Sequence, residues 1–289
     1  MALNIPAQVA ANCRKSPDRA AWLNRLPNAL RDIECRWSLT IGAPYEDATC
    51  AWVAPVQLAD GTSAVLKLGM PHMESRHEIQ GLRFWDGDPM VRLLDADDEL
   101  GAMLLERCVP GTPQRTLPES EQDLVIATLL RRIWRSPPAG HPFRPLSALT
   151  DYWSNQTLAD IERWPDPGLV REGLSLLKEL PRTAPTERLL ATDLHAGNVL
   201  RSNREPWLVI DPKPFVGDPA YDATQHLFNC EARLRSDPVS TIRRIADLFG
   251  VDRERVRLWT FAREAAEPRD NWNSEDSIAL ARALSPLRL

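Results

Sequence analysis

The spacing of apolar residues changes from that of strands to that of helices near residue 108, and this change limits the folds that the chain can adopt. Between residues 37 and 106 the apolar residues mostly alternate with polar ones, apart from a helical stretch at Met73–Asp86. From Glu119 onward they recur three or four positions apart. The proline-containing segment Cys108–Pro113 separates the two patterns. The sequence therefore predicts an α+β protein with a β-rich lobe at residues 1–107 and a mostly helical lobe at residues 108–289.

The β-rich lobe is predicted to begin with a helical lead-in at residues 1–35, broken at Pro6, Pro17 and Pro27. Two hairpins should follow it, with the strands Ala51–Leu58, Ser63–Leu68, Met90–Leu94 and Ala102–Glu106. The first hairpin has the strongest local signal, because Asp60-Gly61 between two β-prone runs favours a tight turn.

The second lobe is predicted to contain six helices, at Glu119–Trp134, Leu146–Trp164, Gly168–Leu180, Ala220–Arg235, Val239–Phe249 and Arg253–Glu267. One segment interrupts this pattern. Residues 198–210 contain two short apolar runs joined by a polar turn, so they are predicted to form a small hairpin inside the helical lobe.

Three oxygen-bearing side chains flank this small hairpin. Asp193 and Asn198 stand five positions apart in a glycine-containing loop, and Asp211 comes directly after the returning strand. Because a hairpin brings its ends together, we expect Asn198 and Asp211 to converge near Asp193. Hard oxygen ligands of this kind suit Mg²⁺. The same pattern occurs in phosphoryl-transfer enzymes of the protein-kinase class, in which the first Asp accepts the proton of the substrate hydroxyl.

Lys67 and Glu78 in the first lobe are predicted to form the complementary half of such a site. Strand alternation places Lys67 on the opposite face from Leu66 and Leu68, and Glu78 shares a helical stripe with Leu82. A carboxylate on an apolar stripe is rarely left without a partner, and Lys67 is the expected one. A strand lysine paired with a helix glutamate holds nucleotide phosphates in kinases.

Composition argues against several other classes of function. The 35 basic and 40 acidic side chains give a net charge of -5, so nucleic acid would meet a weakly repulsive surface. No apolar run approaches the roughly 18 residues that a membrane span needs, and no signal peptide is recognisable, so a cytoplasmic protein is expected. The predicted partner is a small molecule, and the sequence is compatible with a monomer or a dimer.

These segments resemble the aminoglycoside phosphotransferases of the protein-kinase-like superfamily, most closely the streptomycin 6-phosphotransferase and hydroxyurea phosphotransferase branch. The resemblance runs from about Trp37 to the C-terminus and is strongest at residues 65–112 and 190–229. In the second of these segments Asp-Leu-His-Ala-Gly-Asn and Asp-Pro-Lys-Pro-Phe-Val-Gly-Asp-Pro-Ala-Tyr-Asp match the family pattern. It implies a bilobal kinase fold that clamps MgATP between its lobes. The implied reaction is transfer of the γ-phosphoryl group to a hydroxyl of a streptomycin-like aminoglycoside, or to hydroxyurea, which inactivates the antibiotic.

The resemblance also implies roles for single residues at the reacting end of the nucleotide. By this resemblance Asp193 is the general base or the residue that orients the substrate, while Asn198 and Asp211 are the Mg²⁺ ligands. Lys67 with Glu78 would anchor the phosphates of ATP.

Other implied roles concern adenine and the support of the catalytic loop. Glu106 and Cys108 would belong to a hinge whose backbone groups pair with adenine, and Asp222 would support the loop from the following helix. Two features depart from the family pattern. Ala191 replaces the histidine of the usual His-Gly-Asp, so a supporting hydrogen bond is missing or replaced, and the expected phosphate-covering loop is poor in glycine.

Recognition of the acceptor is predicted near the C-terminus. Glu264, Glu267 and Asp270 lie beside two tryptophans between Trp259 and Trp272. Such a set can bind a cationic, guanidinium-bearing sugar through charge and cation–π contacts. The alternative is a solvated helix face.

Two polar residues near the catalytic loop have more than one interpretation. His195 is interpreted as a structural histidine, because no second histidine stands at metal-ligand spacing. Lys213 either contacts phosphate or is a solvated lysine between two prolines.

Two other functions remain open from the sequence. The chain could phosphorylate an unidentified cellular metabolite, because fold and loop motifs do not fix the acceptor. It could also be a nucleotide-binding pseudokinase, as Ala191 and the glycine-poor loop allow. A protein-substrate kinase is disfavoured, because no Ala-Pro-Glu element or activation segment follows Asp211.

Overall fold

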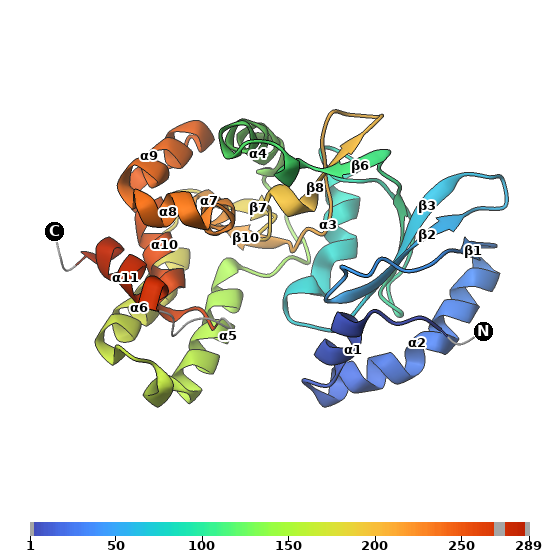
Figure 1. Cartoon of the computed structure of the whole chain (residues 1–289), viewed down its shortest axis with the longest axis horizontal. Coiled ribbons are helices and arrows are strands. Elements are labelled where there is room, and N and C mark those ends of the chain that lie inside the picture. Colours follow the sequence, from blue (N-terminus) through green and yellow to red (C-terminus); the bar gives the residue numbers. More distant parts are fainter. Residues whose placement is uncertain (1–2, 269–274, 287–289) are drawn as a thin grey trace. The chain divides into compact units, whose positions relative to one another are not determined.

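The structure is a computed structural model that describes residues 3–268 and 275–286, and its chain forms two compact units (Figure 1). The first unit comprises Met1–Thr112 and Leu200–Ile210, and the second comprises Pro113–Val199 and Asp211–Leu289. The first unit contains an antiparallel sheet and the second is mostly helical, which confirms the predicted α+β class. None of the described helices is long and apolar enough to cross a membrane.

Five antiparallel strands form the main sheet of the first unit, in the order β1-β2-β3-β5-β4. Their bounds are Thr40–Ile41 (β1), Ala51–Gln57 (β2), Ser63–Gly69 (β3), Leu93–Asp97 (β4) and Ala102–Glu106 (β5). The first predicted hairpin is therefore present as β2 and β3, with Val53 opposite Lys67.

The strand predicted at Met90–Leu94 begins instead at Leu93. Met90 forms a parallel bridge with Val209, and the Val91 N–H donates to the carbonyl of Val209 at 3.0 Å. The first residues of the predicted strand thus bond to a distant segment of the chain, and only the later ones pair with β5.

Helices α1 (Ala7–Cys13) and α2 (Pro17–Arg36) pack against the main sheet of the first unit (Figure 1). Trp22 and Leu26 of α2 share one buried core with Leu66 and Leu68 of β3. The predicted break at Pro27 is wrong, because Pro27 lies inside α2. A proline removes one backbone donor and strains the turn before it, but burial of the apolar side chains on both sides of Pro27 holds the helix together.

The helix predicted at Met73–Asp86 is a 3₁₀ turn, η1 (Glu74–His77), followed by helix α3 (Glu78–Trp85). Asp86 ends α3 with a positive φ of 47°. Glu78 is the first residue of α3, directly after η1.

The small hairpin predicted at residues 198–210 is present as β8 (Val199–Ser202) and β9 (Leu208–Val209), beside β6 (Pro110–Pro113). Most of it belongs to the first unit rather than to the helical one. Arg204 accounts for this placement, because its guanidinium donates to Glu106 at 2.9 Å and to the carbonyls of Gly87 and Met90 at 2.8 and 3.0 Å.

The second unit contains eight described helices and a two-stranded antiparallel sheet of β7 (Arg188–Leu190) and β10 (Phe215–Gly217). Its helices are α4 (Glu119–Ile133), α5 (Leu146–Ala159), α6 (Pro167–Glu179), α7 (Pro219–Asn229), α8 (Glu231–Ser236), α9 (Pro238–Phe249), α10 (Arg253–Ala266) and α11 (Glu275–Leu284). The helix predicted at Ala220–Arg235 is divided into α7 and α8, because Cys230 leaves the helical conformation with ψ of 43°. Helix α10 packs against α6, α7 and α11, and so lies in the core of this unit.

Candidate active site

The loop that carries Asp193 follows β7 in the second unit. Thr192, directly before Asp193, has a positive φ of 50°, which a β-branched residue rarely adopts. Two contacts hold Thr192 there: its N–H donates to Asp222 at 2.8 Å, and its hydroxyl donates to the carbonyl of Lys213 at 2.6 Å. Such a backbone conformation persists only where the surroundings determine it. The loop is therefore tightly fixed at the residue before Asp193.

Asp222, on the first turn of α7, supports this loop from inside the unit. Its side chain accepts from the N–H groups of Ala191 and Thr192 at 3.2 and 2.8 Å and from the indole N–H of Trp134 at 2.9 Å. Asp222 is only 1% exposed, and burial raises the pKa of its carboxyl to about 6, although the three donors favour the charged form. Ala191, in place of the usual histidine, has no polar side chain that could support the loop. In this segment the hydroxyl of Thr192 makes a side-chain hydrogen bond instead, to the carbonyl of Lys213.

Asn198 and Asp211 lie close to the same loop. The amide nitrogen of Asn198 donates to the carbonyl of Asp193 at 3.0 Å, and its amide oxygen is the atom that a cation would bind. The segment after Asp211 returns to the loop, because the N–H of Lys213 donates to the carbonyl of Ala191 at 2.9 Å. The donor set of carboxylate and amide oxygens fits Mg²⁺.

Two side chains contact the carboxylate of Asp193. The ammonium of Lys213 pairs with Oδ2, and the side-chain amide of Gln225 donates to Oδ1 at 2.8 Å. Lys213 is 17% exposed at its side chain, so it is a partner of Asp193 rather than a solvated lysine. Gln225 was not expected from the sequence. The available signal was its position three residues after Asp222, on the same face of α7.

His195 lies within the loop as a hydrogen-bond acceptor. Its Nδ1 accepts from the N–H of Gly197 at 3.0 Å, and its Nε2 lies 4.0 Å from Oδ1 of Asp193. Burial lowers the pKa of His195 below its ordinary value, although the charge of Asp193 opposes this. A Cβ at Gly197 would lie 2.7 Å from Cε1 of His195, so a larger residue there would displace the imidazole.

A polar pocket of about 470 Å³ adjoins the loop within the second unit. Its lining includes Arg115, Glu119 and Gln122 together with His195 and Asn229. This volume lies in the range of ordinary small-molecule sites, and the lining offers both donors and acceptors. The pocket could therefore admit a small polar molecule beside the loop.

Lys67 and Glu78 form an ion pair in the first unit. The ammonium of Lys67 on β3 lies 2.5 Å from Oε1 of Glu78 on α3, and both side chains are buried. Ala64, Leu66 and Leu68 of β3 enter the core beneath α2, so the alternation predicted for this strand is present. A buried lysine keeps its charge when a carboxylate compensates it, and this pair can present a fixed cation to an anionic ligand.

Glu106 and Cys108 are the residues predicted to belong to an adenine-binding hinge. Glu106 has partners within the protein, and Cys108 is partly buried. The carboxylate of Glu106 binds Arg204, and its N–H donates to the carbonyl of Arg92 at 2.9 Å. Burial raises the pKa of the Cys108 thiol to about 11, so the thiol stays protonated near neutral pH. Pairing of this segment with adenine remains a prediction.

The three residues predicted to contact the acceptor differ in their surroundings. Glu264 and Glu267 are buried, at 5% and 9% exposure. The carboxylate of Glu267 accepts from Nε of Arg263 at 2.6 Å, so its charge is compensated within the protein. Asp270 lies outside the described residues. Contact of any of these side chains with an acceptor remains a prediction.

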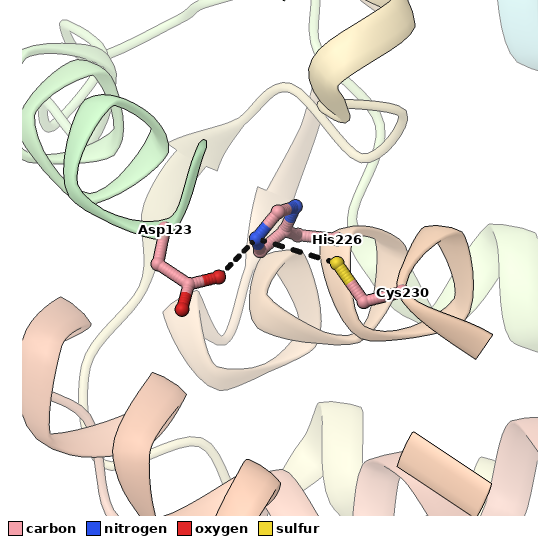
Figure 2. Close-up of side chains that lie close together, drawn as sticks. All are labelled: Asp123, His226 and Cys230. Carbon is pink, nitrogen blue, oxygen red and sulfur yellow. Dashed lines mark hydrogen bonds and ion pairs between the residues drawn. The ribbon is translucent and has the colours of Figure 1, made fainter. Parts of the chain in front are cut away.

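A second cluster of polar side chains lies at the junction of α4 with α7 and α8, where Asp123, His226 and Cys230 are buried together (Figure 2). Nε2 of His226 lies 2.8 Å from Asp123, and Arg233 and Arg244 donate to the same carboxylate at 2.8 Å. A divalent ion would have to displace these donors beside two guanidinium charges. We interpret the cluster as an ion-pair network that joins helices rather than as a metal site.

Comparison with known proteins shows similarity over nearly the whole chain. The family model for aminoglycoside/hydroxyurea antibiotic resistance kinases matches residues 36–276. A streptomycin 6-kinase from Streptomyces glaucescens is 36% identical over 299 residues, which cover 98% of this chain and 94% of that protein. A hydroxyurea phosphotransferase from Kitasatospora aureofaciens is 38% identical over 248 residues, which cover 82% of this chain and 71% of that protein.

Similarity among solved structures concerns the fold. The choline kinase from Streptococcus pneumoniae has a TM-score of 0.61, with 13% sequence identity over 88% of this chain and 98% of that chain. The two chains thus share a protein-kinase-like fold.

Proposed function

Because the chain belongs to the aminoglycoside/hydroxyurea antibiotic resistance kinase family, we propose that it inactivates streptomycin by transferring the γ-phosphoryl group of ATP to one of its hydroxyls. We place streptomycin first, because the streptomycin 6-kinase relative matches 98% of this chain and the hydroxyurea phosphotransferase 82%, at similar identities of 36% and 38%. Hydroxyurea is the second candidate. The observation that supports the reaction most directly is Asp193, a partly exposed carboxylate on a loop whose backbone is fixed by Asp222.

In this proposal each named side chain has one task. Asp193 accepts the proton of the acceptor hydroxyl as that oxygen attacks the phosphoryl group. Asn198 and Asp211 hold Mg²⁺, which supplies positive charge to the phosphate oxygens of the nucleotide. Lys67, oriented by Glu78, binds phosphate oxygens.

The remaining proposed contacts concern recognition. The backbone at Glu106–Cys108 pairs with adenine, and Glu264 and Asp270 contribute negative charge toward a cationic acceptor. Asp222 keeps the loop in place and does not touch the substrate.

The proposal is tested by measuring ADP release from the purified protein with MgATP, with and without streptomycin or hydroxyurea. One acceptor should stimulate release, and Asp193→Asn should abolish the stimulation while ATP binding, measured by calorimetry, is kept. A lost general base costs about 10²–10⁴-fold in rate. The matched control is Asp160→Asn, a change at an exposed carboxylate, which should behave as the wild type.

Two results would contradict the proposal. If neither acceptor stimulates ADP release while ATP still binds, the substrate is a different metabolite or the protein is a pseudokinase. If Asp193→Asn loses ATP binding, Asp193 has a role in the nucleotide site rather than at the acceptor.

A further inference from the structure

A buried arginine lies in the core of the second unit, on α10. The guanidinium carbon of Arg263 lies 5.5, 4.8 and 5.0 Å from the ring centres of Trp153, Tyr221 and Phe228, and the residue is only 4% exposed. Removing a charge from water is costly unless it is compensated and its donors are used. The partners of Arg263 therefore matter for the whole unit.

The donors of Arg263 are directed to two places. On one side Nε donates to Oε2 of Glu267 at 2.6 Å, which compensates the charge. On the other side Nη1 donates to the hydroxyl of Thr224 at 2.6 Å and Nη2 donates to Oε1 of Gln225 at 3.0 Å. Arg263 thus connects the carboxylate of Glu267 to two consecutive side chains of α7.

This connection fixes which way the amide of Gln225 points. A guanidinium only donates hydrogen bonds, so the oxygen of the Gln225 amide must face Arg263. The NH₂ group of the same amide must then face the other way, and there it donates to Oδ1 of Asp193 at 2.8 Å. Arg263 thus donates to Gln225, and Gln225 donates to Asp193, while Glu267 accepts from the other side of Arg263.

The two oxygens of Asp193 are therefore held in different ways. Oδ1 is bound to an amide that a buried network fixes, whereas Oδ2 pairs with Lys213, a flexible side chain. The ammonium beside Oδ2 can move aside for an acceptor hydroxyl, whereas the amide beside Oδ1 is held in place by Arg263. Oδ2 is thus the oxygen suited to take the proton.

We propose that Gln225 is a positioning residue, which holds the carboxylate of Asp193 by Oδ1 so that Oδ2 faces the acceptor hydroxyl. Glu267 then acts on the reaction through Arg263 and Gln225, without touching the acceptor. In the step served by this geometry the hydroxyl proton passes to Oδ2, the hydroxyl oxygen bonds to the γ-phosphorus, and the bond from that phosphorus to ADP breaks. The inference rests on the proposed role of Asp193.

The test replaces Gln225 by Glu in the full-length protein. Gln225→Glu keeps the size of the side chain and its contact with Arg263, but it puts an oxygen where the N–H had faced Asp193. We expect kcat for the accepted antibiotic to fall by about 10-fold to 100-fold, since small misplacement of a reacting group costs up to about 10² in rate. KM for the acceptor and the affinity for ATP should stay within about twofold of the wild type.

Three further variants make the result decisive. Gln225→Met removes the donor without adding a charge, so it should show the same loss of kcat if the mere loss of the contact is the cause. Glu267→Gln should lower kcat while KM is unchanged, and its effect should not add to that of Gln225→Met, because both act through one chain of contacts. Gln156→Met, at an exposed glutamine of α5 outside the loop and the pocket, is the matched control with wild-type kinetics.

Each contrary outcome overturns the inference. A wild-type kcat in both Gln225 variants shows that Asp193 needs no positioning by α7. A raised KM with unchanged kcat in Glu267→Gln shows that Glu267 binds the acceptor directly. Wild-type activity of Asp193→Asn in the same assay overturns both this inference and the proposed role of Asp193, whereas an inactive Asp193→Asn beside active Gln225 variants overturns this inference alone.

Discussion

Asp222 should make the stability of the protein fall as pH rises through the weakly acidic range. Burial raises the pKa of its carboxyl to about 6 in the folded protein, whereas the unfolded chain keeps the ordinary value of 3.8. Below pH 3.8 the carboxyl is protonated in both states, and the tighter proton binding of the folded state contributes in full to the free energy of unfolding. Between pH 4 and pH 6 the unfolded chain loses this proton first, so this contribution is lost as pH rises through the folded pKa.

The size of this effect follows from the difference between the two pKa values. The difference is about 2 pKa units, and each unit corresponds to about 1.4 kcal/mol, so about 3 kcal/mol of unfolding free energy should disappear between pH 4 and pH 7. The three N–H groups that donate to Asp222 favour its charged form and keep the loss from being larger.

The assay is urea unfolding of the wild type and of Asp222→Asn at a series of pH values from 4.5 to 7.5. Asparagine has nearly the same shape and does not titrate, so the difference between the two proteins isolates Asp222. The free energy of unfolding of the wild type should fall relative to the variant as pH rises. Parallel profiles would refute the reasoning, and a relative rise with pH would mean that the N–H donors outweigh burial. Asp160→Asn, at the surface, should leave the wild-type profile unchanged.

Two further predictions concern the buried ion pairs. Lys67→Met should weaken ATP binding by at least about tenfold, because a charge-assisted phosphate contact is worth roughly 1.5–3 kcal/mol. Calorimetric titration measures the affinity, with Lys15→Met, at an exposed lysine, as the control. An unchanged affinity would show that Lys67 does not bind the nucleotide. Asp123→Asn should lower the free energy of unfolding by about 1.5–3 kcal/mol, because charge-assisted hydrogen bonds from Arg233 and Arg244 are lost, while KM for both substrates stays unchanged. Zn²⁺ should not raise the melting temperature of the wild type, and a large rise would show a metal site at Asp123 after all.

The predictions from sequence that describe the structure correctly depend on residues near one another along the chain. Strand alternation and a helical stripe indicate the pairing of Lys67 with Glu78, eleven positions apart, and the structure contains it. The Asp-Gly turn between β2 and β3 likewise depends on its own residues. Local conformational preference is enough in such cases, because neighbouring residues meet whatever the rest of the chain does.

The features that the sequence did not indicate depend on distant contacts. Pro27 should break α2 by its local chemistry, but the core beneath the sheet keeps the helix whole. Gln225 looks like an ordinary helix residue, and the role proposed for it depends on its contact with Arg263, 38 positions away. Glu267 pairs with Arg263 four positions before it, a spacing that the sequence contains, but the burial of both side chains depends on the packing of α10 against α6 and α7.

The placement of Leu200–Ile210 in the first unit has a consequence for the order in which the protein is made. A ribosome completes Thr112 long before it reaches Arg204 and Val209, so the nascent first unit lacks the partners of Glu106 and Met90. Those partners arrive only after α4, α5 and α6 have been synthesised. The first unit therefore cannot finish folding during synthesis ahead of the second, and a chain cut at the boundary after Thr112 would be an incomplete fragment rather than an independent domain.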